Sequence, residues 1–219
     1  MHRLKKMIQE EYPGVPYFIF GHSMGSYITR NYMACYGTGI SGAIVAGTGD
    51  EPDMVLAMGK MVASVTGFFK GEKAKGKFID KIAFGAYNKR IKDARTSVDW
   101  LTCVEQKVDE YIADETCGFM FTANGFKTLF ELIARTKKTE NMEKIPKGLP
   151  VFMIAGKEDP VGAYGVAVER VYKRYKELGM TDVELQLYPD ARHELLNEKE
   201  SEKIMEDIAL WLSKHLVIF

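Results

Sequence analysis

The chain has 219 residues, of which 46% are hydrophobic and 27% charged, and this balance is typical of a globular protein. Its 30 Lys and Arg side chains equal its 30 Asp and Glu side chains, so net charge favours neither nucleic acid nor an anionic membrane as a partner. No apolar run approaches the roughly 18 residues of a membrane span, and the three cysteines form no C-x-x-C pair, which indicates reduced thiols in a cytoplasmic protein.

The first part of the chain alternates between expected strands and helices. Apolar spacing predicts a helix that ends near Tyr12, a buried strand over 15–20, a helix over 26–36 and a short strand over 43–46. This alternation is typical of a parallel sheet. The same alternation returns near the C-terminus. There the sequence predicts strands over 151–155 and 183–188, a helix between them that ends before Gly179, and a last helix with Trp211 on its apolar face.

The stretch between these two parts lacks a clear strand. Met54, Met58, Met61 and Val65 follow helical spacing, and further apolar residues indicate more helices. We therefore predict an α/β fold in which a helical insertion divides a parallel sheet. The expected parts are a first core segment over 1–49, a helical cap over 50–147 and a second core segment over 148–219.

The segment Gly21-His22-Ser23-Met24-Gly25 fits the G-x-S-x-G pattern between an expected strand and an expected helix. In that context the pattern predicts a tight turn that presents Ser23 as a nucleophile. Glycines at both flanks are expected to avoid Cβ collisions. The Met24 N–H, at the positive end of the helix, is expected to stabilise an oxyanion. The structural alternative is a glycine-rich turn with a capping serine.

A serine nucleophile needs a base, and the chain has four histidines. His22 neighbours the nucleophile and its side chain is expected to diverge from that of Ser23, while His2 and His215 lie in terminal helices. His193 follows an expected strand, at the edge where such sheets place catalysis. Elimination therefore favours His193 as the base, the alternative being a histidine of a surface loop.

The base in turn needs a carboxylate partner, and the order in this fold is serine, acid, histidine. Asp159 lies in the turn after the strand over 151–155 and precedes His193 by one helix and one strand. The two loops should therefore leave the sheet at the same edge. Glu158 and Asp190 remain the rival candidates.

At Gly21–Ser26, at 156–162 and at Asp190–Glu194, the chain resembles the lysophospholipase and monoacylglycerol-lipase branch of the α/β-hydrolase superfamily, the serine aminopeptidase S33-like hydrolases. The resemblance covers nearly the whole chain and matches the insertion only loosely. It implies a cap over the active site and cleavage of acyl esters of lipids or small molecules without a cofactor. No metal site, nucleic-acid partner or stable membrane insertion is expected.

The resemblance has one departure, at the start of the chain. Members of this family have several strands and a helix before the nucleophile strand, and the loop after one of those strands supplies a second oxyanion N–H, commonly from a His-Gly segment. This chain begins at the helix before that strand, so we expect a fragment or a late start. The partial sheet would have an unpaired edge.

The expected function is that of a serine hydrolase acting on carboxylic esters, with monoacyl lipids as favoured substrates. Two enzymatic alternatives keep the triad: an aminopeptidase-type hydrolase and a carbon–carbon hydrolase. A third alternative is an inactive binding module. Methionines and phenylalanines of the cap, such as Met54, Met58, Phe68, Phe69 and Phe126, are expected either to line an acyl pocket or to form the core of the cap itself.

Overall fold

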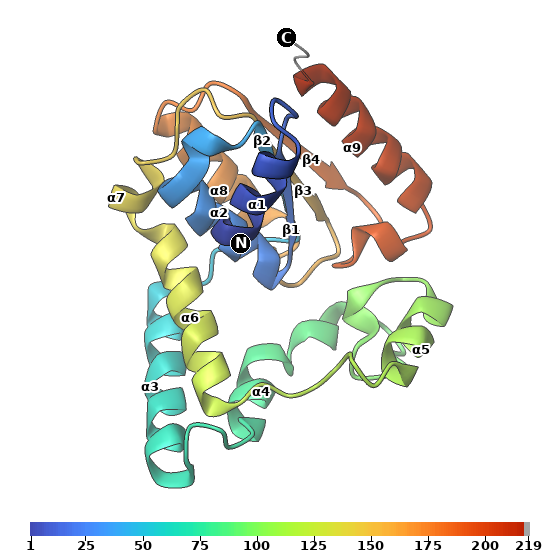
Figure 1. The fold of residues 1–219 in the computed structure, drawn as a ribbon. Coiled ribbons are helices and arrows are strands. Elements are labelled where there is room, and N and C mark those ends of the chain that lie inside the picture. Colours follow the sequence, from blue (N-terminus) through green and yellow to red (C-terminus); the bar gives the residue numbers. More distant parts are fainter. Residues whose placement is uncertain (217–219) are drawn as a thin grey trace.

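The computed structural model describes residues 1–216, and its centre is a sheet of four parallel strands (Figure 1). The strands are β1 (Phe18–His22), β2 (Gly42–Ala46), β3 (Val151–Gly156) and β4 (Val183–Tyr188), in the order β1-β2-β3-β4. The prediction of four adjacent parallel strands is therefore confirmed. All residues of β2 and β3 are buried, because both strands have a neighbour on each side and helices on each face.

Helices cover the two faces of this sheet. Helices α2 (Met24–Tyr36) and α8 (Val166–Glu177) pack on the face that carries Ala43 and Val45. Helix α9 (Ser201–His215) packs on the face that carries Ile44 and Ala46. Successive residues of β2 thus face opposite helix layers, as strand geometry requires. Because both faces of the strand are covered, every residue in its sequence is apolar.

The N-terminal helix α1 (His2–Glu11) forms as predicted, but its apolar residues are not its buried ones. Leu4 and Met7 are each 57% exposed, whereas Lys5 is buried. The helix is attached to α2 through aromatic and polar contacts. His2 Nδ1 lies 3.0 Å from the Tyr32 hydroxyl, and the His2 ring stacks on Tyr36 at 3.9 Å.

The segment between β2 and β3 is helical. It contains α3 (Asp53–Lys70), α4 (Lys77–Phe84), α5 (Glu105–Ala113), α6 (Ala123–Lys137) and α7 (Thr139–Met142), and Figure 1 shows α3 to α6 extending from one edge of the sheet. Helices α3 and α6 lie side by side and share an apolar core with Tyr27 of α2. Within residues 1–216 no helix is both long and apolar enough to cross a membrane.

The apolar side chains of this insertion divide into buried and exposed sets. Phe126 is buried in the core that α3 and α6 share, so the expectation of cap core is confirmed for it, whereas Met142 is buried in the core on one face of the sheet. An outward-facing set is exposed, each member by at least 57%: Met54, Met58, Met61, Phe68, Phe69 and Phe119. For those residues the expectation of a buried cap core is wrong, and the expectation that they contact an acyl chain stays a prediction.

The turn between β1 and α2 is tighter than the sequence indicated. The strand runs to His22 and the helix begins at Met24, which leaves Ser23 alone between them. Ser23 has φ 54° and ψ −120°, a backbone conformation that costs a non-glycine residue about 1–3 kcal/mol. Because Ser23 is the single residue of this turn, its backbone alone makes the change from strand to helix. Its side chain therefore projects from the turn and belongs to neither element.

The two glycines that flank this turn differ in what surrounds them. A Cβ on Gly21 would lie 2.2 Å from Thr29 Oγ1 and 2.3 Å from the Gly25 carbonyl oxygen. A Cβ on Gly25 would meet nothing within 4 Å. The collision argument therefore holds for Gly21 and is wrong for Gly25, because the first turn of α2 leaves open space on that side.

We expect Trp211→Ala to lower the free energy of unfolding by about 3–5 kcal/mol, the usual cost of removing a large buried aromatic side chain. Trp211 is 3% exposed, stacks on Phe152 at 5.7 Å and meets the edge of Phe18 at 5.9 Å. Leu210→Ala on the same helix is the control, since Leu210 is 72% exposed, and should change stability by no more than about 0.5 kcal/mol. Urea unfolding of both variants measures the difference, and equal losses would contradict this packing.

We expect Gly21→Ala to destabilise the protein by about 1–3 kcal/mol, since the new methyl group would force the elbow backbone to move. Gly25→Ala should be neutral or slightly stabilising, because alanine is favoured over glycine in a helix by up to about 1 kcal/mol. The same unfolding measurement compares the two variants. A Gly25→Ala variant as unstable as Gly21→Ala would show that the space beside Gly25 is not free.

Candidate active site

Three loops that follow parallel strands meet at the carboxyl edge of the sheet. Ser23 follows β1, Asp159 follows β3 and His193 follows β4. Because β3 and β4 pair in register from Val151–Val183 to Gly156–Tyr188, their loops leave the sheet side by side. Ligand sites of open parallel sheets lie at this edge.

The structure joins Asp159 to His193. His193 Nδ1 lies 3.0 Å from Asp159 Oδ2, and the two side chains are 2% and 0% exposed. The other carboxylate oxygen, Oδ1, accepts a hydrogen bond from the Val161 N–H at 2.9 Å. Since a carboxylate only accepts, Nδ1 of His193 is the donor, and Nε2 carries the free lone pair that a base needs.

The two rival carboxylates lie elsewhere. Glu158 and Asp190 are both exposed, and within residues 1–216 neither forms a hydrogen bond or ion pair with His193. The turn after β3 explains the difference between neighbours in sequence. Asp159 points inward because its own backbone N–H and carbonyl are fixed by Gly156 and Tyr164.

Ser23 lies at the same edge without a hydrogen bond to the histidine. Its N–H donates to the Ala46 carbonyl at 3.1 Å, at the end of β2. The next residue, Gly47, faces the His193 ring, since a Cβ there would lie 3.1 Å from His193 Cε1. Within the described residues the Ser23 hydroxyl and the His193 ring form no hydrogen bond. Such contacts often tighten only when substrate is bound.

Two other aromatic rings lie close to the His193 ring. The His22 ring centroid is 4.6 Å away and the Trp100 centroid 5.1 Å away. His22 Nε2 donates to the His193 carbonyl oxygen at 2.9 Å. Burial, with a smaller contribution from His193, lowers the pKa of His22, so this ring stays neutral and serves as a fixed donor. The sequence predicted His22 as part of the turn and gave no sign of this contact.

Met24 occupies the position expected of an oxyanion donor. It is the first residue of α2, and the first N–H groups of a helix have no acceptor within the helix. They also carry the partial positive charge of the helix dipole. The Ser23 carbonyl, in contrast, is occupied by the Ser26 hydroxyl at 2.6 Å and the Ser26 N–H at 2.9 Å.

A second set of contacts at this edge comes from the insertion. Arg192 Nη1 donates to the carbonyl oxygens of Asp99 and Thr102, at 2.7 and 3.0 Å. Cys103 and Arg192 both contact the buried carboxylate of Glu198. Sequence reasoning missed Trp100, Cys103 and Glu198. The partners lie about 95 positions apart along the chain, and no short motif marks such a contact.

A cavity of about 250 Å³ opens near the base. Its walls are mostly charged or polar, not the methionines and phenylalanines expected for an acyl pocket. The side chains lining it are those of Tyr87, Arg90, Ile91, Lys92, Cys103, Glu158, Tyr164, Asp190 and Arg192. Ser23 and His193 are not among them, so this cavity is separate from the reacting groups.

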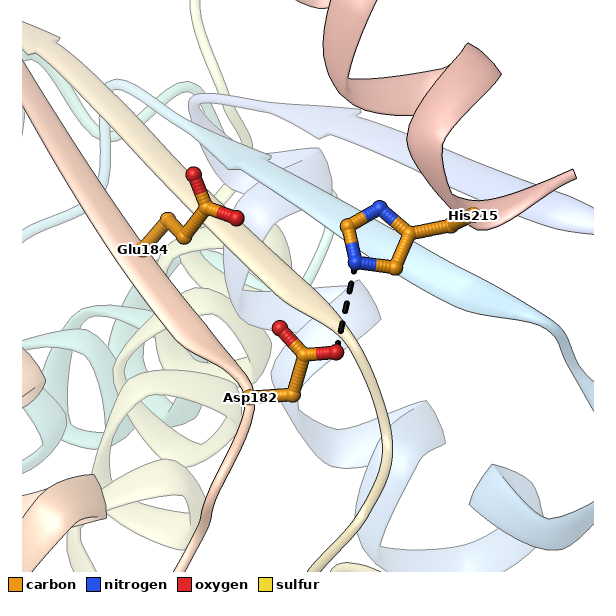
Figure 2. Close-up of side chains that lie close together, drawn as sticks. All are labelled: Asp182, Glu184 and His215. Atoms are coloured by element: carbon orange, nitrogen blue, oxygen red, sulfur yellow. Dashed lines mark hydrogen bonds and ion pairs between the residues drawn. The ribbon is translucent and has the colours of Figure 1, made fainter.

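Asp182, Glu184 and His215 form a group whose ligand atoms lie within 4.8 Å of one another, as a metal site would require (Figure 2). Each side chain already has a partner. His215 Nε2 lies 3.2 Å from Asp182 Oδ2, and Glu184 Oε1 lies 2.6 Å from Lys214 Nζ. The cluster stands at the start of β4, at the opposite end of the strand from His193, and the His215–Asp182 hydrogen bond and the Lys214–Glu184 ion pair connect the end of α9 to that strand.

Comparisons with known proteins identify several relatives of this chain. A monoglyceride lipase of Saccharomyces cerevisiae is 27% identical over 227 residues, which cover 98% of this chain and 66% of the relative. A monoacylglycerol lipase of Mycolicibacterium smegmatis is 26% identical, over 94% of this chain and 65% of the relative. The crystal structure of a highly thermostable carboxyl esterase from Bacillus coagulans, in complex with glycerol, is 31% identical. It superposes with a TM-score of 0.86 over 99% of this chain and 70% of that one.

The chain thus spans about two thirds of the length of the curated relatives it matches. Its sheet order, its one-residue elbow and the placement of the three loops fit an α/β-hydrolase core. A family model described as "Serine aminopeptidase, S33" matches residues 1–200. Since this match covers most of the sequence, the chain belongs to the serine aminopeptidase S33 family of α/β-hydrolases.

Proposed function

We propose that the protein is a serine hydrolase of carboxylic esters, in which Ser23, His193 and Asp159 form the catalytic triad. The observation that carries this proposal is the buried Asp159–His193 pair at the sheet edge where Ser23 stands on a strained turn. A carboxylate that accepts from Nδ1 holds the imidazole in the tautomer with a basic Nε2 and stabilises the imidazolium that forms.

The reaction proceeds in two halves. His193 Nε2 takes the hydroxyl proton while Ser23 Oγ bonds to the acyl carbon, and the carbonyl becomes an oxyanion. The Met24 N–H donates to that oxyanion. Collapse of the tetrahedral intermediate breaks the ester bond, and His193 returns the proton to the departing alkoxide. Water then attacks the acyl-enzyme with the same base and releases the acid, which restores Ser23.

The proposed substrates are monoacyl lipids and small esters. Two curated relatives are named as monoglyceride and monoacylglycerol lipases, and a structural neighbour is named as a carboxyl esterase. The outward face of α3 supports an apolar substrate, since Met54, Met58 and Phe68 are 74%, 57% and 84% exposed. Exposed apolar surface of this kind is characteristic of contact with lipid or with another apolar surface. The insertion over 50–147 is then a cap beside the reacting groups.

We expect Ser23→Ala to abolish hydrolysis of p-nitrophenyl butyrate and of a monoacylglycerol, with a loss of roughly a millionfold by analogy with another serine hydrolase. His193→Ala should cost about as much, because the nucleophile and its base act as a unit. Asp159→Asn should cost about 10⁴-fold, since the base remains but its tautomer is wrong. Steady-state rates, with no metal or cofactor added, measure all three variants.

Ser213→Ala is the matched control, since Ser213 is exposed on α9 and its hydroxyl bonds only to the Ala209 carbonyl within the described residues. It should keep the rate of the unaltered protein. A fluorophosphonate probe should label the unaltered protein and the control, but not Ser23→Ala. Retention of the esterase rate by Ser23→Ala would reject Ser23 as the nucleophile.

A further inference from the structure

The backbone on both sides of the base is held by contacts from three separate parts of the chain. The Arg192 N–H donates to Glu198 Oε1 at 2.7 Å. The His193 carbonyl accepts from His22 Nε2, and the Glu194 N–H donates to the Leu101 carbonyl at 2.7 Å. Three consecutive residues are therefore fixed through their main chain, so the direction of the His193 side chain is set before its ring meets any partner.

Among these contacts, the one made by Glu198 involves a buried carboxyl group. Glu198 is 4% exposed, and within residues 1–216 no Lys, Arg or His nitrogen forms an ion pair with its carboxylate. Its donors are neutral: the Arg192 N–H, the Cys103 N–H at 3.2 Å and the Cys103 thiol at 2.6 Å. Burying a carboxylate is costly unless hydrogen bonds compensate, and here the two backbone N–H groups and the thiol supply that compensation.

The carboxylate also joins the insertion to the base loop. Through Cys103 it holds the segment 99–103, which in turn carries Trp100. The Thr102 hydroxyl donates to the Asn197 carbonyl at 2.9 Å, one residue before Glu198. The Trp100 ring centroid lies 5.1 Å from that of His193, and Arg192 donates to the Asp99 carbonyl of the same segment. One buried group thus fixes both the main chain before His193 and the segment that carries the ring beside it.

We propose that Glu198 is a positioning residue for the base of the proposed hydrolase. It acts on His193 through the Arg192 N–H and through the segment 99–103, and it does not touch the reacting atoms. This inference rests on the proposed function, because positioning matters only if His193 is the base. Its effect should fall on the chemical step, since a base displaced by a fraction of an ångström transfers the proton less well while substrate binding is unchanged.

The test compares Glu198→Ala and Glu198→Gln with Glu200→Gln, which removes an exposed carboxylate two residues away. We expect Glu198→Ala to lower kcat by about 10- to 100-fold with little change in KM, as small misplacements of catalytic groups do. Glu198→Gln keeps an oxygen that can accept from the Arg192 N–H, so its kcat should lie between those of Glu198→Ala and the unaltered protein. Glu200→Gln should leave kcat unchanged.

A second measurement follows the position of the segment directly. Trp100 and Trp211 are the two tryptophans of the chain, so a Trp211→Phe background isolates the fluorescence of Trp100. In that background, Glu198→Ala should raise the acrylamide quenching of Trp100, and Glu200→Gln should not. This measurement does not depend on turnover. It therefore tests whether Glu198 holds the segment 99–103 in place even if the proposed hydrolase activity is absent.

The outcomes separate the two proposals. If the unaltered protein has no esterase activity while Glu198→Ala still raises the quenching of Trp100, the proposed hydrolase function is rejected. The role of Glu198 in holding the segment 99–103 would still stand. Unchanged kcat in Glu198→Ala, or a rise in KM alone, would overturn the positioning role. If Glu198→Ala does not fold, the comparison of Glu198→Gln with the unaltered protein replaces it. A Glu198→Gln variant whose kcat and Trp100 quenching equal those of the unaltered protein would then overturn the proposal.

Discussion

The buried contact between Asp159 and His193 is the interaction on which the rest of this site depends. Two ionisable side chains that are almost fully inaccessible can stay there only if their polar atoms are paired. The pairing is possible because β3 and β4 run parallel in register, so the loops after Gly156 and Tyr188 emerge together. Removal of either partner would leave a buried polar group without compensation, which ties the stability of this edge of the sheet to the geometry of the proposed base.

Backbone strain is concentrated beside the same groups. Three of the four non-glycine residues with positive φ in residues 1–216 lie there, namely Ser23 and, after the acid, Ala163 and Tyr164; the fourth is Asp93 in the insertion. Such conformations persist only where surrounding contacts determine them. Around Asp159 those contacts are visible: the Tyr164 N–H donates to the Asp159 carbonyl at 2.8 Å, and the Arg90 guanidinium lies 3.5 Å from the centre of the Tyr164 ring. The turn that directs Asp159 inward is thus braced by a residue of the insertion.

Much of the core could be predicted from the sequence, because local patterns determine it. A strand buried on both faces must be apolar throughout, which identified the strands at 43–46 and 151–155 within a residue. The carboxyl ends of parallel strands share one edge, which was enough to place the turn with Glu158 and Asp159 beside the loop of His193, whereas the choice between the two carboxylates needed the contacts of the fold. The sequence located the turn at Ser23 correctly, but the argument that a Cβ would collide holds only for Gly21. The open space around Gly25 depends on what lies beyond α2, and no motif encodes that.

Contacts between distant segments were beyond such patterns. Lys5 is buried and Leu4 exposed in α1, because burial depends on which neighbour the helix meets and periodicity gives only the spacing. The phenylalanines of α3 follow helical spacing equally well whether they face a core or solvent. In the sequence, Glu198 is indistinguishable from the other acidic residues of a polar loop. Its proposed positioning role depends on a contact with the Cys103 N–H, 95 positions away. A single sequence contains no local trace of that pairing.

The insertion consequently contributes to the proposed site in two different ways. Its segment 99–103 is bound by hydrogen bonds to the base loop, and such directional contacts fix one geometry. The outward face of α3 presents exposed apolar side chains with no such partners in the described residues, and apolar contact is non-directional and tolerant of shape. The first part therefore suits the proposed chemistry, which needs a base held in place, and the second suits the apolar substrates proposed above.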